Sequence, residues 1–382
     1  MPGTTVVMSL PAAATEWPGP VQRVQELADS GLKTLPPTYV HPSPPSRALA
    51  AAPIPVIDIS ALTTTTNTTT PGDPLGRAQA MRALLSDACR HWGIFHVVNH
   101  GVPREVLASA MSVSRAFFSL PASEKRRYAN NPVTYEGYGS RMGLDPDATL
   151  DWNDYFFHHL GPRADPRNKW PRQPENYRHV ISRYGDEIVA LSRRLLALLS
   201  SGLGLPESTL AEAFAASPAE QLGATFRINL YPKCPQPEAA LGLSPHSDPG
   251  VLTVVQQDRV SGLEVRRVDG NDGAWFRVPP VEDALVVIVG DQMEIATNGV
   301  YKSADHRTAV NGEKERMSLV VFVNPEGEKV IGPLEEMVEM AGGERNFDEM
   351  SYNEYRKFIR VLGVQGKSIL ATRASKTKYP TD

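Results

Sequence analysis

The sequence predicts an α+β protein, with helices gathered in its first half and strands in its second half. In the first half, apolar residues recur at helical spacing over residues 77–92, 103–118 and 178–203. From residue 222 to residue 324, short apolar or alternating runs are separated by Pro, Gly, Asn and Asp. Several short strands with turn residues between them are typical of a sandwich or a barrel. The two halves could also be parts of one domain.

The composition excludes several classes of protein. With 382 residues, 41% of them hydrophobic, the chain can bury a large core. A net charge of −4 without a basic stripe argues against nucleic acid and anionic membranes as partners. The two cysteines give no disulfide framework, and no secretory signal or apolar run of ~20 residues is visible. We therefore expect a soluble, cytoplasmic protein that acts on a small molecule, whereas its protein partners cannot be predicted.

Changes in composition divide the chain into a partly disordered leader, a helix-rich N-terminal region, a strand-rich core, and a C-terminal helix with a tail. Their predicted bounds are 1–52, 53–215, 216–330 and 331–382. Within the leader, Val21, Val24, Leu27 and Leu32 recur near helical spacing, which indicates a short docking helix. The stretch 63–74 is nearly all Thr, Asn, Pro and Gly, and we expect a poorly ordered loop there. The other predicted elements are strands at 54–59, 93–98, 225–231, 251–256, 263–267, 284–289 and 317–323, and a last helix at 351–362.

A possible metal site begins in the segment 244–248. Residues two apart share one face of a strand, so His246 and Asp248 would offer an imidazole and a carboxylate to the same side. These are two of the three ligands of the facial triad of non-haem Fe(II) oxygenases. His306, further along the chain, is the candidate third ligand. A His-x-Asp triplet often arises by chance, and His306 alone could be a structural histidine at a turn.

A possible carboxylate site lies where Arg316 and Ser318 open a strand-like run and share one of its faces. A buried guanidinium and a hydroxyl can together hold a carboxylate, with the arginine bidentate. An Fe(II) oxygenase needs an electron-rich co-substrate, and 2-oxoglutarate has a distal carboxylate that would fit here. The alternative is a surface ion pair, because Lys314 and Glu315 make this part of the chain polar.

Another polar face is predicted on the run 227–231. Arg227, Asn229 and Tyr231 alternate with Ile228, so the three polar residues would share one face of a strand. Buried polar residues need partners, which ligand and water inside a barrel would supply. An edge strand with its polar face in solvent is the alternative.

The order of these motifs resembles the plant 2-oxoglutarate/Fe(II)-dependent dioxygenases, the group with flavonol synthase, anthocyanidin synthase and the gibberellin oxidases. The N-terminal runs 54–58 and 91–101 match that family too, and the resemblance spans residues 54–367. It implies a double-stranded β-helix (jelly-roll) core with helices packed on one side. It implies Fe(II), 2-oxoglutarate and O2 as cofactor and co-substrates, with ascorbate in support. The implied iron ligands are His246, Asp248 and His306, and the implied 2-oxoglutarate residues are Arg316, Ser318 and Tyr231, with Asn229 beside them.

Further segments resemble the jasmonate-induced oxygenases, which hydroxylate jasmonic acid at carbon 12 and so switch off the hormone. These segments are residues 17–28, 135–141, 150–157, 232–237 and 242–250. The resemblance implies conversion of jasmonic acid to 12-hydroxyjasmonic acid. The alternatives within the family are a flavonoid oxygenase, of the flavonol synthase or anthocyanidin synthase type, and another hormone oxidase.

The carboxylate of jasmonic acid would need a cation other than Arg316, which is reserved for 2-oxoglutarate. Arg227 is expected to point into the cavity from its strand. On the last helix, Tyr352, Arg356 and Ile359 lie on one stripe, and we expect this helix and the tail to cover the barrel mouth. We therefore predict that Arg227 and Arg356 clamp the substrate carboxylate, with Tyr352 packing beside it.

Alternatives of other kinds fit parts of the pattern. Arg356 could pair with Glu354, Glu349 or solvent instead of a substrate. A non-catalytic jelly-roll binding protein would be expected to lack a metal ligand, and none is lacking. A zinc hydrolase could use two histidines and an aspartate, but it has no need for Arg316 and Ser318.

Overall fold

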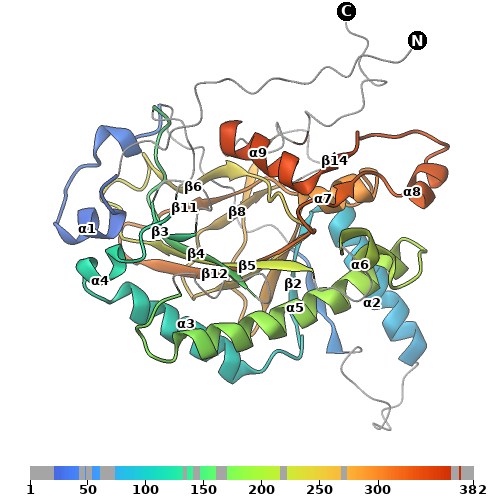
Figure 1. Ribbon diagram of the computed structural model, residues 1–382, viewed down its shortest axis with the longest axis horizontal. Coiled ribbons are helices and arrows are strands. Elements are labelled where there is room, and N and C mark those ends of the chain that lie inside the picture. The colour runs from blue at the N-terminus through green and yellow to red at the C-terminus, as the bar shows by residue number, and fades with distance from the viewer. Residues whose placement is uncertain are drawn as a thin grey trace, which may run out of the picture.

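The computed structural model describes residues 21–42, 48, 54–60, 74–131, 136–140, 147–160, 170–215, 222–267, 273–362 and 370. Two β-sheets face each other, and long helices cover the outer side of the larger sheet (Figure 1). Among the strands of these sheets, β1 and β2 pair in parallel and the other neighbours pair antiparallel.

Within the described residues, the larger sheet has eight strands and the smaller has four. In spatial order, the larger sheet consists of β1 (Val56–Asp58), β2 (Ile94–Val98), β10 (Leu285–Val289), β7 (Leu252–Gln257), β12 (Arg316–Asn324), β5 (Gly223–Tyr231), β4 (Asp154–Leu160) and β3 (Gly137–Gly139). The smaller sheet consists of β6 (Leu241–His246), β11 (His306–Ala309), β8 (Leu263–Arg266) and β9 (Trp275–Arg277). A separate pair, β13 (Val330–Ile331) and β14 (Met350–Ser351), precedes the last helix.

Three long helices, α2 (Pro74–His91), α3 (Arg104–Phe118) and α5 (Tyr177–Gly202), pack together beside the larger sheet. The shorter helices are α1 (Val24–Asp29), η1 (Pro37–Tyr39), α4 (Ala122–Arg126), α6 (Thr209–Phe214), α7 (Asp291–Ala296), α8 (Glu335–Met340) and α9 (Tyr352–Leu362). Within the described ranges, no helix has both the length and the apolar character that crossing a membrane requires.

The two faces of the larger sheet bury different sets of side chains. On β10, Leu285, Val287 and Val289 join the core that the helices cover. Val286 and Ile288 point the other way, into a second apolar cluster that includes residues of the smaller sheet. A strand buried on both faces reads as a continuous apolar run, as β10 does. The two facing sheets with helices on one outer side confirm the predicted α+β fold with a jelly-roll core.

The predicted long helices and core strands are present, with ends shifted by up to three residues. Short elements such as β4 and α7 have no predicted counterpart, because His or charged residues interrupt their apolar pattern. The strand implied by the segment 244–248 overlaps only the end of β6. The loop predicted at 63–74 lies outside the described residues except for Pro74, which begins α2 instead. The first 20 residues of the leader and most of the tail after Leu362 also lie outside the described ranges.

The predicted region boundaries do not coincide with structural layers. Strands β1 to β4 come from the predicted helix-rich region but lie at the two ends of the larger sheet, beside core strands. The boundary predicted after residue 330 falls inside β13. The helix-rich region and the core therefore share one sheet.

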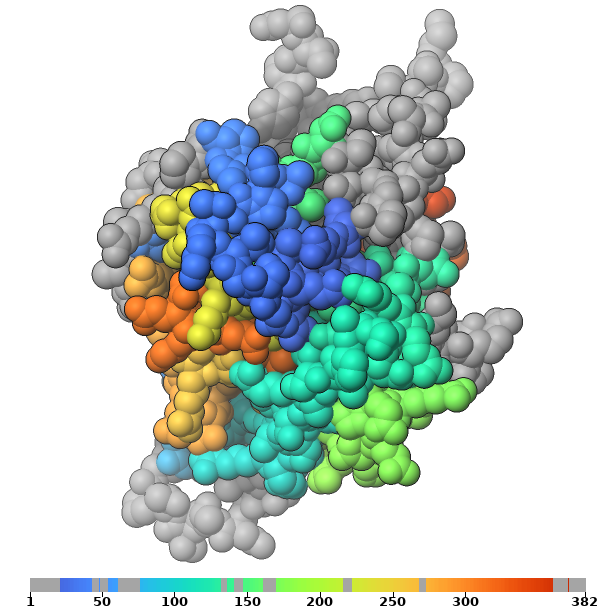
Figure 2. All heavy atoms as spheres, turned by 90° about the vertical axis from the view of Figure 1, so that its left-hand side faces the viewer, coloured from blue at the N-terminus to red at the C-terminus, as the bar shows by residue number. Residues whose placement is uncertain are grey.

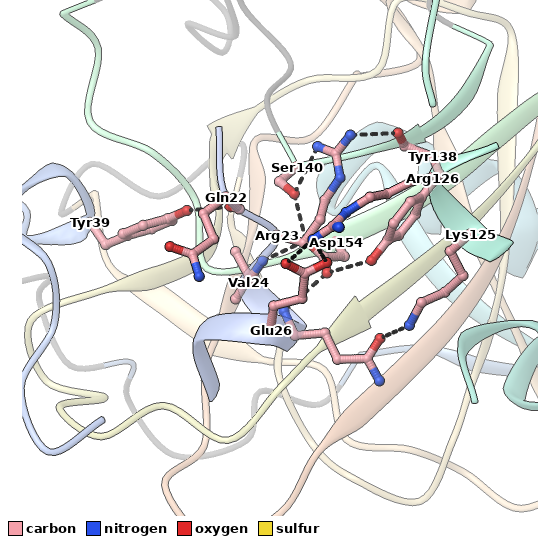
Figure 3. Close-up of polar contacts among 11 residues, drawn as sticks. Gln22, Arg23, Val24, Glu26, Tyr39, Lys125, Arg126, Tyr138, Ser140 and Asp154 are labelled. Atoms are coloured by element: carbon pink, nitrogen blue, oxygen red, sulfur yellow. Dashed lines mark hydrogen bonds and ion pairs between the residues drawn. The ribbon is translucent and has the colours of Figure 1, made fainter. Parts of the chain in front are cut away.

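The leader is fixed to the body of the protein by a buried carboxylate. The two oxygens of Asp154, the first residue of β4, accept hydrogen bonds from the backbone N–H groups of Val24 and Gln25 at 2.8 and 3.0 Å. Asp154 therefore caps the start of α1 from a distant part of the chain. Ser140 and Tyr138 donate hydrogen bonds to the same carboxylate at 2.5 and 3.1 Å (Figure 3).

An apolar cluster surrounds this polar contact. Val24, Leu27 and Tyr39 of the leader pack with Leu150 and Trp152, and the ring centroids of Tyr39 and Trp152 are 5.1 Å apart. Figure 2 shows the leader, in blue, spread over this face of the molecule. The docking helix expected from the spacing of Val24 and Leu27 is thus present as α1, and it uses these two residues.

Replacing Asp154 by Ala should lower the free energy of unfolding by about 3 kcal/mol, because several buried donors and the start of α1 lose their acceptor. Urea denaturation at neutral pH measures this change. The matched control is Glu26→Ala on the same helix, whose ion pair with Arg126 at 2.6 Å is largely exposed. The control should cost less than about 1 kcal/mol. Equal losses for the two variants would show that Asp154 does not anchor the leader.

Candidate active site

A cavity of about 470 Å³ lies between the two sheets. One wall consists of the inward side chains of β5 and β12, where Asn229 pairs opposite Ser318. Across the cavity, β6 and β11 place His246 opposite His306. Residues that were far apart in the sequence, and that were predicted to share a site, therefore border one space.

The three candidate metal ligands lie together. The Nε2 atom of His246 is 3.8 Å from Oδ1 of Asp248, and Nε2 of His306 is 3.6 Å from Oδ2 of the same carboxylate. One ligand atom from each of the three residues lies within 4.8 Å of the others, and all three side chains are buried. Two imidazoles and one carboxylate converging in this way match the donor set of a facial triad, which suits Fe(II).

Backbone hydrogen bonds orient both rings. Nδ1 of His246 lies 2.8 Å from the carbonyl oxygen of Ser244, and Nδ1 of His306 lies 3.1 Å from that of Ala304. A carbonyl can only accept, so each Nδ1 carries the proton and each Nε2 presents a lone pair to the metal position. Burial and the neighbouring His306 lower the pKa of His246, so the ring is in its neutral, metal-binding form near pH 7.

Asp248 reaches the site in a different way from the one predicted. Strand β6 ends at His246, and Asp248 lies in the loop that follows, so the two residues do not share a strand face. A hydrogen bond of 2.8 Å from the backbone N–H of Asp291 to the carbonyl oxygen of Asp248 holds this loop. The side-chain Oδ2 of Asp248 is buried and has no hydrogen-bond partner among the described residues, as expected of an atom that binds a cation.

Arg316 provides a cation at one end of the cavity. Its Nη2 donates to Oε1 of Gln257 at 3.0 Å, and its Nε donates to the carbonyl of Val260 at 3.2 Å. The guanidinium carbon lies 5.1 Å from the ring centroid of Tyr231, while the buried Nη1 has no partner in the described structure. Together with the nearby hydroxyl of Ser318, this orphaned donor fits the distal carboxylate of 2-oxoglutarate. Arg316 is 3% exposed and forms no ion pair with a described residue, so the surface ion pair expected as the alternative is not seen in the described part of the chain.

Arg227 is buried further along the same wall. Its Nε donates to Oδ1 of Asn229 at 2.5 Å, and its guanidinium carbon lies 4.1 Å from the ring centroid of Tyr155. Burial lowers the pKa of Arg227, and its Nη2 has no partner in the described part of the chain. Arg227 pairs opposite Val320 and Arg316 opposite Tyr231, so the two arginines are about 13 Å apart along β12 and β5.

Helix α9 borders the cavity with Tyr352, Arg356 and Ile359, the stripe predicted from the sequence. The hydroxyl of Tyr352 donates to Oδ1 of Asn324 at 2.7 Å, which ties the helix to the end of β12 opposite Arg316. Arg356 forms no ion pair with a described residue, and its guanidinium carbon is 5.8 Å from the ring centroid of Tyr352.

The acidic partners considered for Arg356 are engaged elsewhere. Glu354 accepts hydrogen bonds from the hydroxyl and the backbone N–H of Ser351 at 2.8 and 3.1 Å. Glu349 is 3.6 Å from Arg345.

Several residues at the site were not predicted from the sequence. Gln257, which binds Arg316, lies two positions after the cavity residue Val255 on β7, so the two-residue period could have identified it. Tyr155 lies on β4, which was not predicted as a strand. Asp291 borders the cavity from the start of α7, and burial raises its pKa to about 7.

Comparisons with known proteins agree with this geometry. Residues 222–325 match the family model described as 2OG-Fe(II) oxygenase superfamily, and residues 54–177 match that of the non-haem dioxygenase in morphine synthesis N-terminal region. Jasmonate-induced oxygenase 2 of Arabidopsis thaliana is 44% identical over 367 residues, which cover 94% of this chain and 95% of that protein. Flavonol synthase 1 of Crocosmia x crocosmiiflora is 36% identical and covers 83% of this chain and 92% of its own length.

Among solved structures, a crystal structure of JOX2 in complex with 2OG, Fe and JA matches with a TM-score of 0.83. The two chains are 45% identical, and the match covers 94% of this chain and 99% of the other. A dioxygenase for auxin oxidation from rice matches with a TM-score of 0.66 at 26% identity, over 84% of this chain and all of the other. The chain therefore belongs to the 2OG-Fe(II) oxygenase superfamily and is an enzyme, an oxidoreductase that uses Fe(II) and 2-oxoglutarate.

Proposed function

We propose that this enzyme hydroxylates jasmonic acid at carbon 12, with Fe(II), 2-oxoglutarate and O2, and with ascorbate as a supporting reductant. The observation that carries the proposal is a single cavity in which a metal-ligand set accompanies two separate cationic groups. Jasmonate-induced oxygenases are similar over nearly the whole chain, and the JOX2 crystal structure contains 2OG, Fe and JA.

His246, Asp248 and His306 would hold the iron on one side only, which leaves the positions toward the cavity free. When bound, Fe(II) and 2-oxoglutarate supply the activation of O2, with succinate and carbon dioxide as co-products. Arg316 and Ser318 would fix the distal carboxylate of 2-oxoglutarate, while Gln257 and Tyr231 hold the guanidinium of Arg316 in place.

At the other end, Arg227 and Arg356 would bind the substrate carboxylate, with Tyr352 packing beside it. A carboxylate held there directs the apolar remainder of the molecule back toward the metal ligands. The wall between Arg227 and the far end of β12 carries Val320 and Phe322, which exclude water from the apolar part of the substrate. A substrate whose carboxylate is fixed at one end, and whose apolar part lies along this wall, has one of its carbons held near the metal site.

Replacing Asp248 by Ala should abolish product formation and lower iron content by tenfold or more, because it removes the anionic ligand of the triad. Iron per protein after reconstitution and 12-hydroxyjasmonic acid formation are the measurements. The thermal unfolding midpoint of the metal-free protein should stay within a few degrees of wild type. Near-normal turnover by this variant would remove Asp248 from the metal site.

Replacing Arg316 by Lys should weaken the apparent affinity for 2-oxoglutarate by tenfold or more, which is about 1.4 kcal/mol. Lysine keeps the positive charge but loses the planar pair of donors that a carboxylate needs. The measurement is the KM for 2-oxoglutarate at saturating jasmonic acid. An unchanged KM would place the carboxylate of 2-oxoglutarate elsewhere.

Replacing Arg227 or Arg356 by Ala should reduce kcat/KM for jasmonic acid by tenfold or more, because the substrate carboxylate loses a charged donor. Wild type should prefer jasmonic acid over its methyl ester, and both variants should lose this preference. The matched control is Lys357→Ala, since Lys357 is the next residue of α9 but is exposed and does not border the cavity. Variants that oxidise the acid as well as wild type would favour a neutral, flavonoid-like substrate.

A further inference from the structure

Asp291, the first residue of α7, has no part in the metal, co-substrate or substrate contacts proposed above, yet it is 1% exposed and borders the cavity. Its carboxylate accepts hydrogen bonds from two hydroxyl groups. Ser303 donates to Oδ1 and Tyr355 donates to Oδ2, each at 2.7 Å. A buried carboxylate is costly unless such donors satisfy it, so this cluster is a specific arrangement.

The two hydroxyl groups come from different elements of the active site. Ser303 lies three residues before the candidate ligand His306. Tyr355 lies on α9, next to Arg356. The carboxylate of Asp291 therefore joins the segment that carries His306 to the helix that carries the proposed substrate clamp.

The backbone of Asp291 strengthens this connection. Its N–H donates to the carbonyl oxygen of Asp248 at 2.8 Å, in the loop that begins after β6. Asp291 thus binds Ser303 and Tyr355 through its side chain and the Asp248 loop through its backbone. A displacement of α9 at Tyr355 would therefore change the hydrogen bonding of the two ligand-bearing segments directly.

We propose that Asp291 is a positioning residue that couples the seating of α9 over the cavity to the geometry of the metal site. This inference rests on the proposed function, since it assumes that His246, Asp248 and His306 bind iron and that α9 contacts the substrate. In this arrangement, a substrate that binds against α9 also fixes the ligand-bearing segments. Correct seating of α9 is then required for 2-oxoglutarate oxidation to be coupled to substrate hydroxylation.

Two variants distinguish the contact of Asp291 with α9 from its contacts with the segments that carry the metal ligands. Tyr355→Phe removes only the hydroxyl on α9 and leaves Ser303 and the Asp248 loop bound to Asp291. Asp291→Asn keeps the size of the side chain but removes one of its two acceptor oxygens, which disturbs the ligand-bearing segments as well.

The matched control is Ser351→Ala. Ser351 precedes α9, and its hydroxyl accepts a hydrogen bond from the backbone N–H of Glu354 at 3.3 Å, so the change removes a helix cap without touching Asp291. Loss of the cap weakens the first turn of α9 but leaves the hydrogen bond from Tyr355 to Asp291 in place.

Two readouts test the coupling. The first is the visible charge-transfer absorption of the anaerobic complex with Fe(II) and 2-oxoglutarate, and its change when jasmonic acid is added. The second is the ratio of hydroxylated product to succinate. For Tyr355→Phe, we expect a normal absorption before jasmonic acid is added, a weakened response to jasmonic acid, and a product-to-succinate ratio several-fold below wild type. For Asp291→Asn, we expect the same changes and an iron affinity lower by about tenfold.

Ser351→Ala should keep the wild-type absorption response and the wild-type product-to-succinate ratio. If Tyr355→Phe behaves like wild type, or if Ser351→Ala reproduces its defects, the coupling through Asp291 is wrong. If wild-type enzyme itself forms no such absorption with Fe(II) and 2-oxoglutarate, the proposed function fails and this inference fails with it. The two failures are distinguishable, because only the second appears before any residue is changed.

Discussion

The antiparallel pairing of β5 with β12 is the constraint on which the rest of this structure depends. The register places Tyr231, Asn229 and Arg227 opposite Arg316, Ser318 and Val320. Because side chains alternate between the faces of a strand, one face of this pair completes the core under the helices and the other lines the cavity. A shift by one residue would bury Arg227 and Arg316 in the apolar core and turn Ile228 and Leu319 into the cavity. Packing of the apolar face of β5 and β12 against the helices therefore fixes the register of the two strands. The register in turn fixes the positions of the polar side chains that line the cavity.

Buried carboxylates join this rigid sandwich to the segments around it. Asp154 binds the start of α1, and Asp291 binds α9 together with the segments that carry the metal ligands. Each carboxylate is satisfied by several donors, which offsets the cost of removing it from water. If one donor is removed, a carboxylate oxygen is left buried without a hydrogen bond, which is destabilising. Each carboxylate therefore favours the one arrangement of the surrounding segments in which all of its donors are in place.

Much of the fold and of the site could be predicted from the sequence, for physical reasons that differ between residues. The inward direction of Arg227, Asn229 and Tyr231 follows from a two-residue period on a long strand, and the structure agrees. The reason given for Asp248 was wrong, because β6 ends at His246 and a loop delivers the carboxylate. Asp291 could not be identified, since its partners Ser303 and Tyr355 come together only in the folded chain. Sequence periodicity predicts which side chains lie on each face of a strand. It does not predict which loops come together at the ends of the strands.

The charge of the cavity bears directly on the choice of substrate. Arg227, Arg316 and Arg356 all border it, and an iron dication bound by Asp248 would add further positive charge. The two carboxylates of 2-oxoglutarate offset part of this charge, at the iron and at Arg316. Arg227 is buried beside Tyr155 and Asn229, and the carboxylates that act on its charge are Asp151 and Asp248, of which Asp248 would bind iron. A neutral flavonoid would leave the positive charge of the cavity in excess, whereas an anionic substrate would neutralise part of it. The electrostatics of the cavity therefore favour a small carboxylic acid over a neutral polyphenol, independently of sequence similarity.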